Sequence, residues 1–281
     1  MTELVTSNGR TIDQLAAELG ASQQSSGGTS ASRLPELKIN TQVDDDTGKP
    51  LPRGHFYIKG LDTVAYAETV TFRPLAHGFQ YLHYDSQQNK LAGKSRYIQN
   101  FGEEPRDTYG TLRCGKPISS VLREMPENER TKYADITCYR QVRGLVTFTG
   151  KTADGEKVEY TNQPVILMLK GTNFGFFELE FLKKLPRNSN IWDFQATLTT
   201  KRHKNGSVVW FTFHFEPDLK NRLGLDQDTV DSISAIADAI RTENEYVERA
   251  YKSALANQAL DRGAIDALEG ALEDDLVDHA A

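Results

Sequence analysis

Basic and aromatic side chains alternate along several segments of this chain, a pattern suited to contact with a flexible polyanion. In the clearest segment, Arg53, His55, Tyr57 and Lys59 recur at every second position. Residues two apart share one face of a β-strand, so a strand here would present cations and rings together. Rings of this kind stack on unpaired bases while the cations follow the phosphates. The spacing therefore predicts a surface for a single strand of nucleic acid.

The same mixture recurs farther along the chain. Aromatic residues and three cations occupy residues 72–84 and 94–97, and a basic loop is expected at residues 113–116. A basic cluster at residues 201–204 precedes the turn signal Asn205-Gly206. Four aromatic residues are expected to stack bases and seven cations to follow the backbone. The residues expected to contact DNA are Arg53, Tyr57, Lys59, Arg73, Phe79, Tyr81, Tyr84, Lys94, Arg96, Arg113 and Lys116.

Each of these features also has a purely structural interpretation. Tyr and Phe on one face of a strand are more often core residues than stacking surfaces. The cluster at residues 201–204 can equally be the solvated tip of a hairpin. The binding hypothesis gains weight because the basic, aromatic-rich region, an expected flexible arm and an acidic end occur together in one chain.

The distribution of charge divides the chain into three parts. Residues 53–220 hold 24 basic and 18 acidic residues, whereas residues 221–281 hold 5 basic and 14 acidic residues. Residues 1–52 hold 4 basic and 7 acidic residues. A basic middle attracts phosphate, and an acidic end can compete for that surface or recruit partners. The alternative is an acidic terminus that serves solubility alone.

Sequence motifs of common catalytic and cofactor sites are missing. There is no phosphate-binding glycine loop, nucleophile elbow, zinc-protease motif or calcium loop, so we expect no enzyme activity, no catalytic residue and no cofactor. The run Asp44–Asp46 predicts a solvated turn rather than a cation site. Cys114 and Cys138 lie outside any CxxC pair, which argues against zinc and against a disulfide framework.

The elements expected to position these residues are mainly β. Short alternating segments, separated by turn signals such as Asp154-Gly155 and Asn205-Gly206, favour a sandwich or barrel. Residues 175–184 fit a short helix better than a strand. A long amphipathic helix is expected from Thr229, with an interruption at Gly263. The strands are expected near residues 37–40, 55–59, 66–72, 79–84, 142–149, 158–160, 165–169, 192–199 and 208–215.

Four regions follow from composition and periodicity. We expect a flexible N-terminal arm at 1–32, a β-rich nucleic-acid-binding core at 33–222, a C-terminal helix at 223–262 and an acidic tail at 263–281. No apolar run is long enough to span a membrane, and no secretory signal is visible near the start. We therefore expect a cytoplasmic protein that does not engage membranes.

Several short segments together resemble the single-stranded-DNA-binding proteins of tailed phages. They include Arg33-Leu34-Pro35, Phe72-Arg73-Pro74 followed by Phe79-Gln80-Tyr81, Arg113-Cys114-Gly115-Lys116, and Trp192 with Thr199-Thr200 ahead of an aromatic strand. The likeness covers roughly residues 33–260 and is one of layout, since none of these segments is diagnostic alone. It implies an OB-like barrel that binds single-stranded DNA in replication or recombination, in the cytoplasm of a host cell. It also implies that the acidic tail contacts replication proteins.

The chain departs from that family at its end, because residues 277–281 lack the terminal aromatic residue that many such tails carry. Two other classes remain open at this point. A β-rich structural or assembly protein, such as a virion or scaffold component, would use the rings as core and the long helix for oligomerisation. An enzyme or nuclease accessory with a dispersed site is the third alternative. The sequence does not decide whether the protein prefers DNA or RNA, or whether it forms a homo-oligomer.

Overall fold

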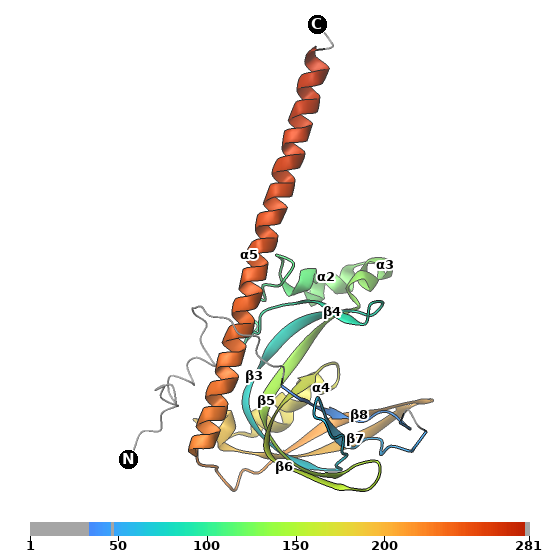
Figure 1. Cartoon of the computed structure of the whole chain (residues 1–281), viewed down its shortest axis with the longest axis vertical. Helices are drawn as coiled ribbons and strands as arrows, with labels where there is room; N and C mark the ends of the chain where they lie inside the picture. Colours follow the sequence, from blue (N-terminus) through green and yellow to red (C-terminus); the bar gives the residue numbers. More distant parts are fainter. Residues whose placement is uncertain (1–33, 46–47, 279–281) are drawn as a thin grey trace. The chain divides into compact units, whose positions relative to one another are not determined.

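The computed structural model describes residues 34–45 and 48–278, with side chains described as far as residue 259 (Figure 1). The expected N-terminal arm lies outside the described residues. The chain forms two compact units. The first unit contains residues up to Phe79, Gln99–Phe101 and Cys138–Thr242, and the second contains Gln80–Ile98, Gly102–Thr137 and the chain from Glu243 onward. The single core expected at 33–222 is thus divided between two units.

The first unit is built on a strongly curled, mainly antiparallel sheet, which confirms the mainly β expectation (Figure 1). Its strand order is β2-β1-β6-β5-β3-β7-β8. One pair, β1 with β6, is parallel. The strands are β1 (Glu36–Ile39), β2 (Phe56–Lys59), β3 (Val70–Asp85), β5 (Ile136–Lys151), β6 (Lys157–Leu169), β7 (Ala196–Asn205) and β8 (Val208–Pro217).

Backbone hydrogen bonds of Tyr66 and Ala67 connect two strands that lie apart in this order. Tyr66 exchanges two hydrogen bonds with Lys151 at the end of β5, with N···O distances of 2.8 and 3.0 Å. Ala67 exchanges two with Phe56 of β2, at 2.7 and 2.9 Å. The four strands β2, β1, β6 and β5 and this short segment therefore form a ring of backbone hydrogen bonds. Closure of this kind removes sheet edges and gives the unit its OB-like barrel character.

Strand β3 is one 16-residue strand, although the sequence predicted two separate strands in this region. Pro74 lies inside this strand, although proline lacks an N–H and normally stands at strand edges. The neighbouring strand accommodates it with Gly144, where an added Cβ would lie 2.3 Å from the Arg73 carbonyl oxygen and 2.9 Å from the Pro74 Cα. The missing side chain at Gly144 thus lets the backbone of β5 approach β3 closely.

Both predicted hairpins are present. The turn at Asp154-Gly155 joins β5 to β6, and Asn205-Gly206 leads from β7 into β8, with Asn205 paired to Val208. Gly155 and Gly206 have φ values of 88° and 59°, the left-handed region that glycine enters without strain. The two predicted segments at 158–160 and 165–169 form the single strand β6.

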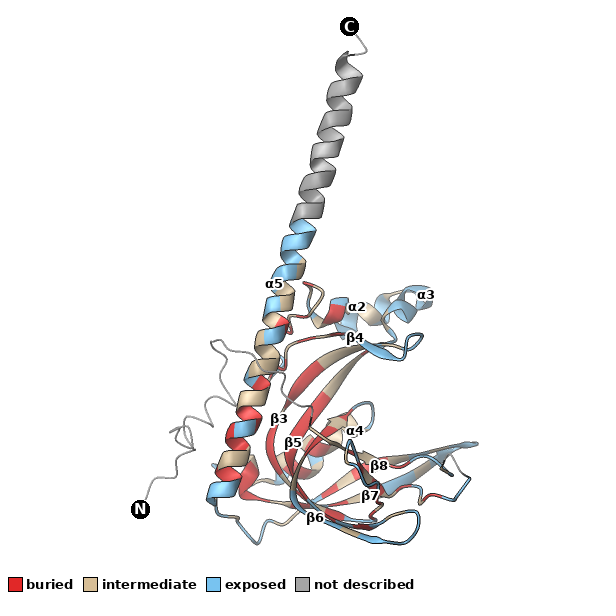
Figure 2. Cartoon of the chain, viewed as in Figure 1, coloured by how far each residue is buried: buried red, intermediate tan, exposed pale blue. Residues whose placement is uncertain are grey.

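Aromatic and aliphatic residues make up the buried core of the first unit. Figure 2 colours much of β3 and β5 as buried. The helical segment predicted at 175–184 is confirmed as α4 (Asn173–Phe176), η3 (Phe177–Phe181) and η4 (Leu182–Lys184). Phe177 and Phe181 of this segment are fully buried and stack 5.3 Å apart. A further short helix, η5 (Ile191–Asp193), precedes β7. These contacts anchor the segment to the barrel interior, because buried aromatic pairs contribute both area and ring geometry.

The long C-terminal helix α5 (Gln227–Asp278) contributes residues to both units. Within the first unit its predicted apolar stripe is confirmed, because Val230, Ile233, Ile236 and Ile240 are all buried. The helix continues through Gly263, where an interruption was predicted. One internal glycine costs a helix only about 1 kcal/mol relative to alanine and does not have to end it.

The second unit packs short elements around the end of β3 and around α5. Strand β4 (Lys90–Lys94) pairs with β3, and the helical elements are η1 (Arg113–Gly115), α2 (Ser119–Glu124), α3 (Glu127–Arg130) and η2 (Thr131–Tyr133). The buried carboxylate of Asp107 organises the loop before η1. It accepts hydrogen bonds from the backbone N–H groups of Tyr109, Thr111 and Cys114 and from the Thr111 hydroxyl. No helix in the described part of the chain is both long and apolar enough to cross a membrane.

Candidate nucleic-acid interface

The β7–β8 hairpin of the first unit gathers the basic cluster at residues 201–204 beside aromatic residues. The strand register pairs Arg202 with Phe211, His203 with Trp210 and Lys204 with Val209. Side chains of paired residues share a face and alternate along each strand. One face of the hairpin therefore carries Arg202, Lys204 and Phe211, and the other carries His203 and Trp210.

Trp210 exposes a large ring on this hairpin. The side chain is 37% exposed, and its ring stacks on His203 with a centroid distance of 5.3 Å and an interplanar angle of 14°. The Nε2 of His203 lies 2.9 Å from the Thr212 hydroxyl, which fixes the imidazole beneath the indole. Exposed tryptophan held by a neighbouring ring offers a preformed surface for a planar ligand.

A loop before β2 adds a cation to the other face of the hairpin. The Arg53 guanidinium lies 5.9 Å from the centroid of Phe211. The Thr200 hydroxyl donates a 2.7 Å hydrogen bond to the carbonyl of Gly54, which ties this loop to β7. Gly54 has a φ of 82°, and an added Cβ would lie 2.6 Å from the Phe211 ring. Glycine is therefore required for the loop to place Arg53 beside Phe211.

Four exposed cations of the first unit have no carboxylate partner among the described residues. Within the described part of the chain, no carboxylate lies within ion-pair distance of Arg53, Lys59, Arg202 or Lys204. Lys201 differs, since its ammonium is 3.9 Å from Glu180. Unpaired cations are the ones that can bind phosphate without first breaking an ion pair.

The predicted alternation is confirmed only within β2, because Arg53 lies in the preceding loop, where Gly54 has a φ of 82°. Phe56 and Ile58 are buried, whereas Tyr57 is half-buried and Lys59 is exposed. The Tyr57 ring lies 6.0 Å from that of Tyr66, and burial raises the pKa of the Tyr57 phenol. The phenol is therefore neutral at physiological pH and does not repel phosphate.

Two predicted contact residues of the first unit belong to its interior. Arg73 donates hydrogen bonds to the carbonyls of Trp192 and Gly224, each at 2.8 Å, and to the Thr229 hydroxyl at 3.3 Å. Phe79 is only 5% exposed, so neither face of its ring is open to a base. Phe79 therefore belongs to the core, the half-buried Arg73 is engaged in structural hydrogen bonds, and we leave both out of the interface.

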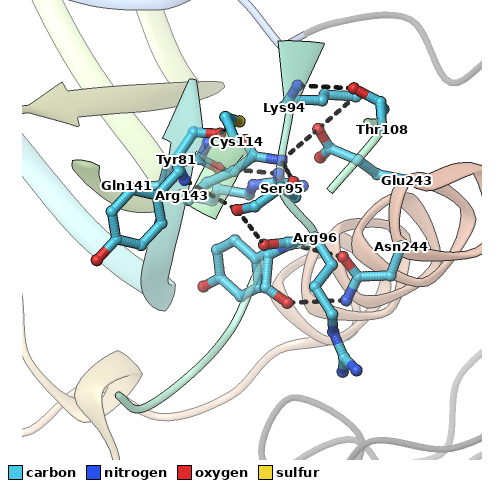
Figure 3. Close-up of polar contacts among 12 residues, drawn as sticks. Tyr81, Lys94, Ser95, Arg96, Thr108, Cys114, Gln141, Arg143, Glu243 and Asn244 are labelled. Atoms are coloured by element: carbon cyan, nitrogen blue, oxygen red, sulfur yellow. Dashed lines mark hydrogen bonds and ion pairs between the residues drawn. The ribbon is translucent and has the colours of Figure 1, made fainter. Parts of the chain in front are cut away.

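Two predicted contact cations of the second unit are paired with carboxylates, and Figure 3 shows Lys94 and its partner Glu243. The Lys94 ammonium lies 2.9 Å from Glu243 of α5 and 5.4 Å from the ring centroid of Tyr246. Arg96 lies 3.6 Å from Glu103 and 3.5 Å from Glu248. Arg106, which was not among the predicted residues, also pairs with Glu248, at 3.3 Å, and with Glu104 at 3.0 Å. Acidic residues of α5 thus neutralise much of this basic region.

The remaining predicted residues of the second unit each make a different structural contact. The Tyr81 backbone exchanges hydrogen bonds with Ser95, and the exposed Tyr84 donates its hydroxyl proton to Asn89 (Figure 3 for Tyr81 and Ser95). The Lys116 ammonium donates to the backbone carbonyl of Ile136. Arg113 is half-buried and has a φ of 59°.

The basic cluster at residues 201–204 stands out in the sequence, but the expected contact residues did not include Arg202, Lys204, Trp210 or Phe211. A signal was present, since a four-residue basic cluster ends at an Asn-Gly turn and the clearest predicted strand follows. Trp210 and Phe211 are adjacent in that strand and so point to opposite faces. Arg53 adds to the face of the hairpin that carries Phe211. This placement depends on a contact between residues 53 and 211, which no local pattern reveals.

No arrangement of side chains in this region indicates metal or thiol chemistry. Among the residues whose placement is described, no three His, Cys, Asp or Glu side chains are grouped to hold a metal ion. Cys114 is buried, and burial raises the pKa of its thiol to about 12, with a further contribution from Asp107. The thiol therefore stays protonated and is a poor nucleophile.

Comparisons of the chain with protein-family models, with curated proteins and with solved structures return no match. The function is therefore argued from the hairpin and the cations around it.

Proposed function

We propose that the first unit binds single-stranded DNA without sequence preference, through the β7–β8 hairpin and the loop that carries Arg53. The observation that supports this most directly is the half-exposed Trp210 ring on a hairpin whose cations Arg202 and Lys204 have no described carboxylate partner. Tyr57 and Lys59 of β2 are the other sequence-predicted residues of this unit that stay available. An OB-like barrel is a fold that binds single strands on its sheet face and connecting loops.

The chemistry of the interface favours single strands over duplex. Trp210 can stack only on a base whose face is exposed, and bases in a duplex are already stacked on one another. Contacts from Arg202, Lys204 and Arg53 to phosphate carry no sequence information. The ligand class is therefore an unpaired strand of any sequence.

The four unpaired cations set an expected salt dependence. Each phosphate neutralised on a single strand contributes about −0.7 to the slope of log K against log salt concentration. If Arg53, Lys59, Arg202 and Lys204 each contact one phosphate, the slope is about −3. Such binding would protect single strands in replication or recombination. Contact between the acidic C-terminal region and replication proteins, and a cytoplasmic site of action, belong to the same proposal.

The test is Trp210→Ala, measured by fluorescence anisotropy with a labelled single strand and its duplex. We expect the variant to bind the single strand about tenfold more weakly, because one stacked base contributes about 1–3 kcal/mol. Trp210→Phe retains a ring and is expected to lose less. Val208→Ala is the matched control, since Val208 is a 62% exposed apolar residue at the tip of the same hairpin.

Two results would overturn the proposal. The intact protein could fail to bind single strands at low salt, or it could bind duplex equally well. An equal loss of affinity in Trp210→Ala and Val208→Ala would show that the hairpin acts through its fold rather than through the indole ring.

A further inference from the structure

A second exposed ring of the first unit lies over a buried aromatic stack. Phe101 is 57% exposed, yet its ring stacks on Phe79 with a centroid distance of 4.1 Å and an interplanar angle of 27°. Phe174 lies 5.6 Å from Phe79 and 6.4 Å from Phe101, with interplanar angles of 25° and 24°. Three nearly parallel rings thus form one cluster, and Phe101 is its exposed member.

A buried cation supports this cluster from within the unit. The Arg140 guanidinium lies 4.9 Å from the centroid of Phe79 and 5.2 Å from that of Phe174, and Arg140 is 3% exposed. Its Nη2 forms a 2.8 Å ion pair with Glu178, and its Nε has no hydrogen-bond partner in the described part of the chain. Cation–π contact and ring stacking together fix Phe79, so the ring that covers it is held in place.

The arrangement repeats the one on the hairpin. Trp210 is an exposed ring whose inner face is covered by His203, and Phe101 is an exposed ring whose inner face is covered by Phe79. In both cases the outer face is left for a flat ligand, and little side-chain freedom is lost when it binds. Every nucleobase has a flat π-face that can stack on a ring held in this way.

We propose that the outer face of Phe101 binds one unpaired nucleobase of the single strand. This inference rests on the proposed function and adds a stacking site on the segment Gln99–Phe101, outside the hairpin. The strand would then be held at two aromatic contacts of the same unit. Phe79, predicted from the sequence as a stacking residue, would act by supporting Phe101 instead of touching the base.

The experiment compares a thymidine oligonucleotide with an abasic strand of equal length, which keeps the sugar–phosphate backbone and lacks bases. Phe101→Ala is expected to bind the thymidine strand about tenfold more weakly and the abasic strand with unchanged affinity. Phe101→Trp keeps an aromatic face and is expected to retain affinity. Phe101→Leu preserves apolar contact with Phe79 without an aromatic face, and is expected to show the same base-dependent loss as Phe101→Ala.

Leu179→Ala is the matched control, because Leu179 is a 54% exposed apolar residue of the same unit that is not part of the ring cluster. It is expected to bind both strands as the intact protein does. An equal loss on both strands in Phe101→Ala, or no loss on either, would overturn the stacking site while leaving the proposed function intact. Failure of the intact protein to bind either strand would overturn the proposed function and the stacking site with it.

Discussion

Two basic residues at the tip of the β7–β8 hairpin in the first unit and two basic residues beside α5 in the second unit have different surroundings. In the first unit, Arg202 and Lys204 lie exposed on a hairpin with no described carboxylate in ion-pair range. In the second unit, Lys94 lies 2.9 Å from Glu243 and Arg96 lies 3.5 Å from Glu248. A cation that is already paired must lose that partner before it can bind phosphate, and this offsets much of the gain. The comparison teaches that a basic segment is informative about binding only when the position of its acidic partners is known.

The largest expected effect is a loss of folding stability of the first unit as the pH falls. His77 of the first unit has its pKa lowered to about 4, mainly by burial and also by the Arg140 charge, with Glu178 acting in the opposite direction. The unfolded chain therefore binds a proton near pH 6.5 that the folded chain accepts only near pH 4. Stability is fully present above about pH 6.5 and falls by up to about 3 kcal/mol as the pH drops to about 4.

Both tryptophans, Trp192 and Trp210, belong to the first unit, so tryptophan fluorescence follows the unfolding of that unit. Urea unfolding between pH 7 and pH 4 measures the loss. His77→Gln removes the titrating group and is expected to flatten the pH dependence over this range. An unchanged pH dependence in His77→Gln would contradict the account of His77.

A smaller effect is expected from the loop that places Arg53 beside the hairpin. In Gly54→Ala, alanine must adopt the unfavourable φ of 82°, and its Cβ lies within 2.6 Å of the Phe211 ring. We therefore expect the free energy of unfolding to fall by about 2–3 kcal/mol and single-strand binding to weaken. Gly48→Ala is the matched control, because Gly48 has the same φ of 82° with no atom within 4 Å. That control is expected to lose about 1 kcal/mol and to bind normally. Equal losses of stability and binding in the two variants would contradict the proposed packing of this loop on Phe211.

Much of the fold could be predicted from local pattern. The alternation around Tyr57 placed Phe56 and Ile58 in the core, and the turn signals Asp154-Gly155 and Asn205-Gly206 identified two hairpins. These features depend on residues a few positions apart, where the period of the strand and the φ preference of glycine decide the structure. The continuity of β3 through Pro74 could not be predicted, because it requires Gly144 on a neighbouring strand.

The candidate site was harder to predict because its electrostatics depend on distant residues. Lys94 and Glu243 are 149 positions apart, and Arg53 meets a ring at position 211. Ring spacing in the sequence also failed to separate the buried Phe79 from the exposed Phe101 that covers it. Composition indicated a basic and aromatic surface, but only the tertiary contacts distinguish unpaired cations from neutralised ones.

The most direct test of this account compares two double variants with the same change in net charge. Arg202→Gln with Lys204→Gln removes two unpaired cations from the first unit, and Lys94→Gln with Arg106→Gln removes two paired cations from the second. Single-strand affinity is measured for both across a salt series, with circular dichroism to confirm that each variant is folded. We expect the first pair to bind roughly tenfold more weakly and to reduce the magnitude of the salt slope by about 1.4, while the second pair changes little. Equal weakening by the two pairs, or a larger effect of the second, would contradict the claim that the strand binds the unpaired cations of the hairpin.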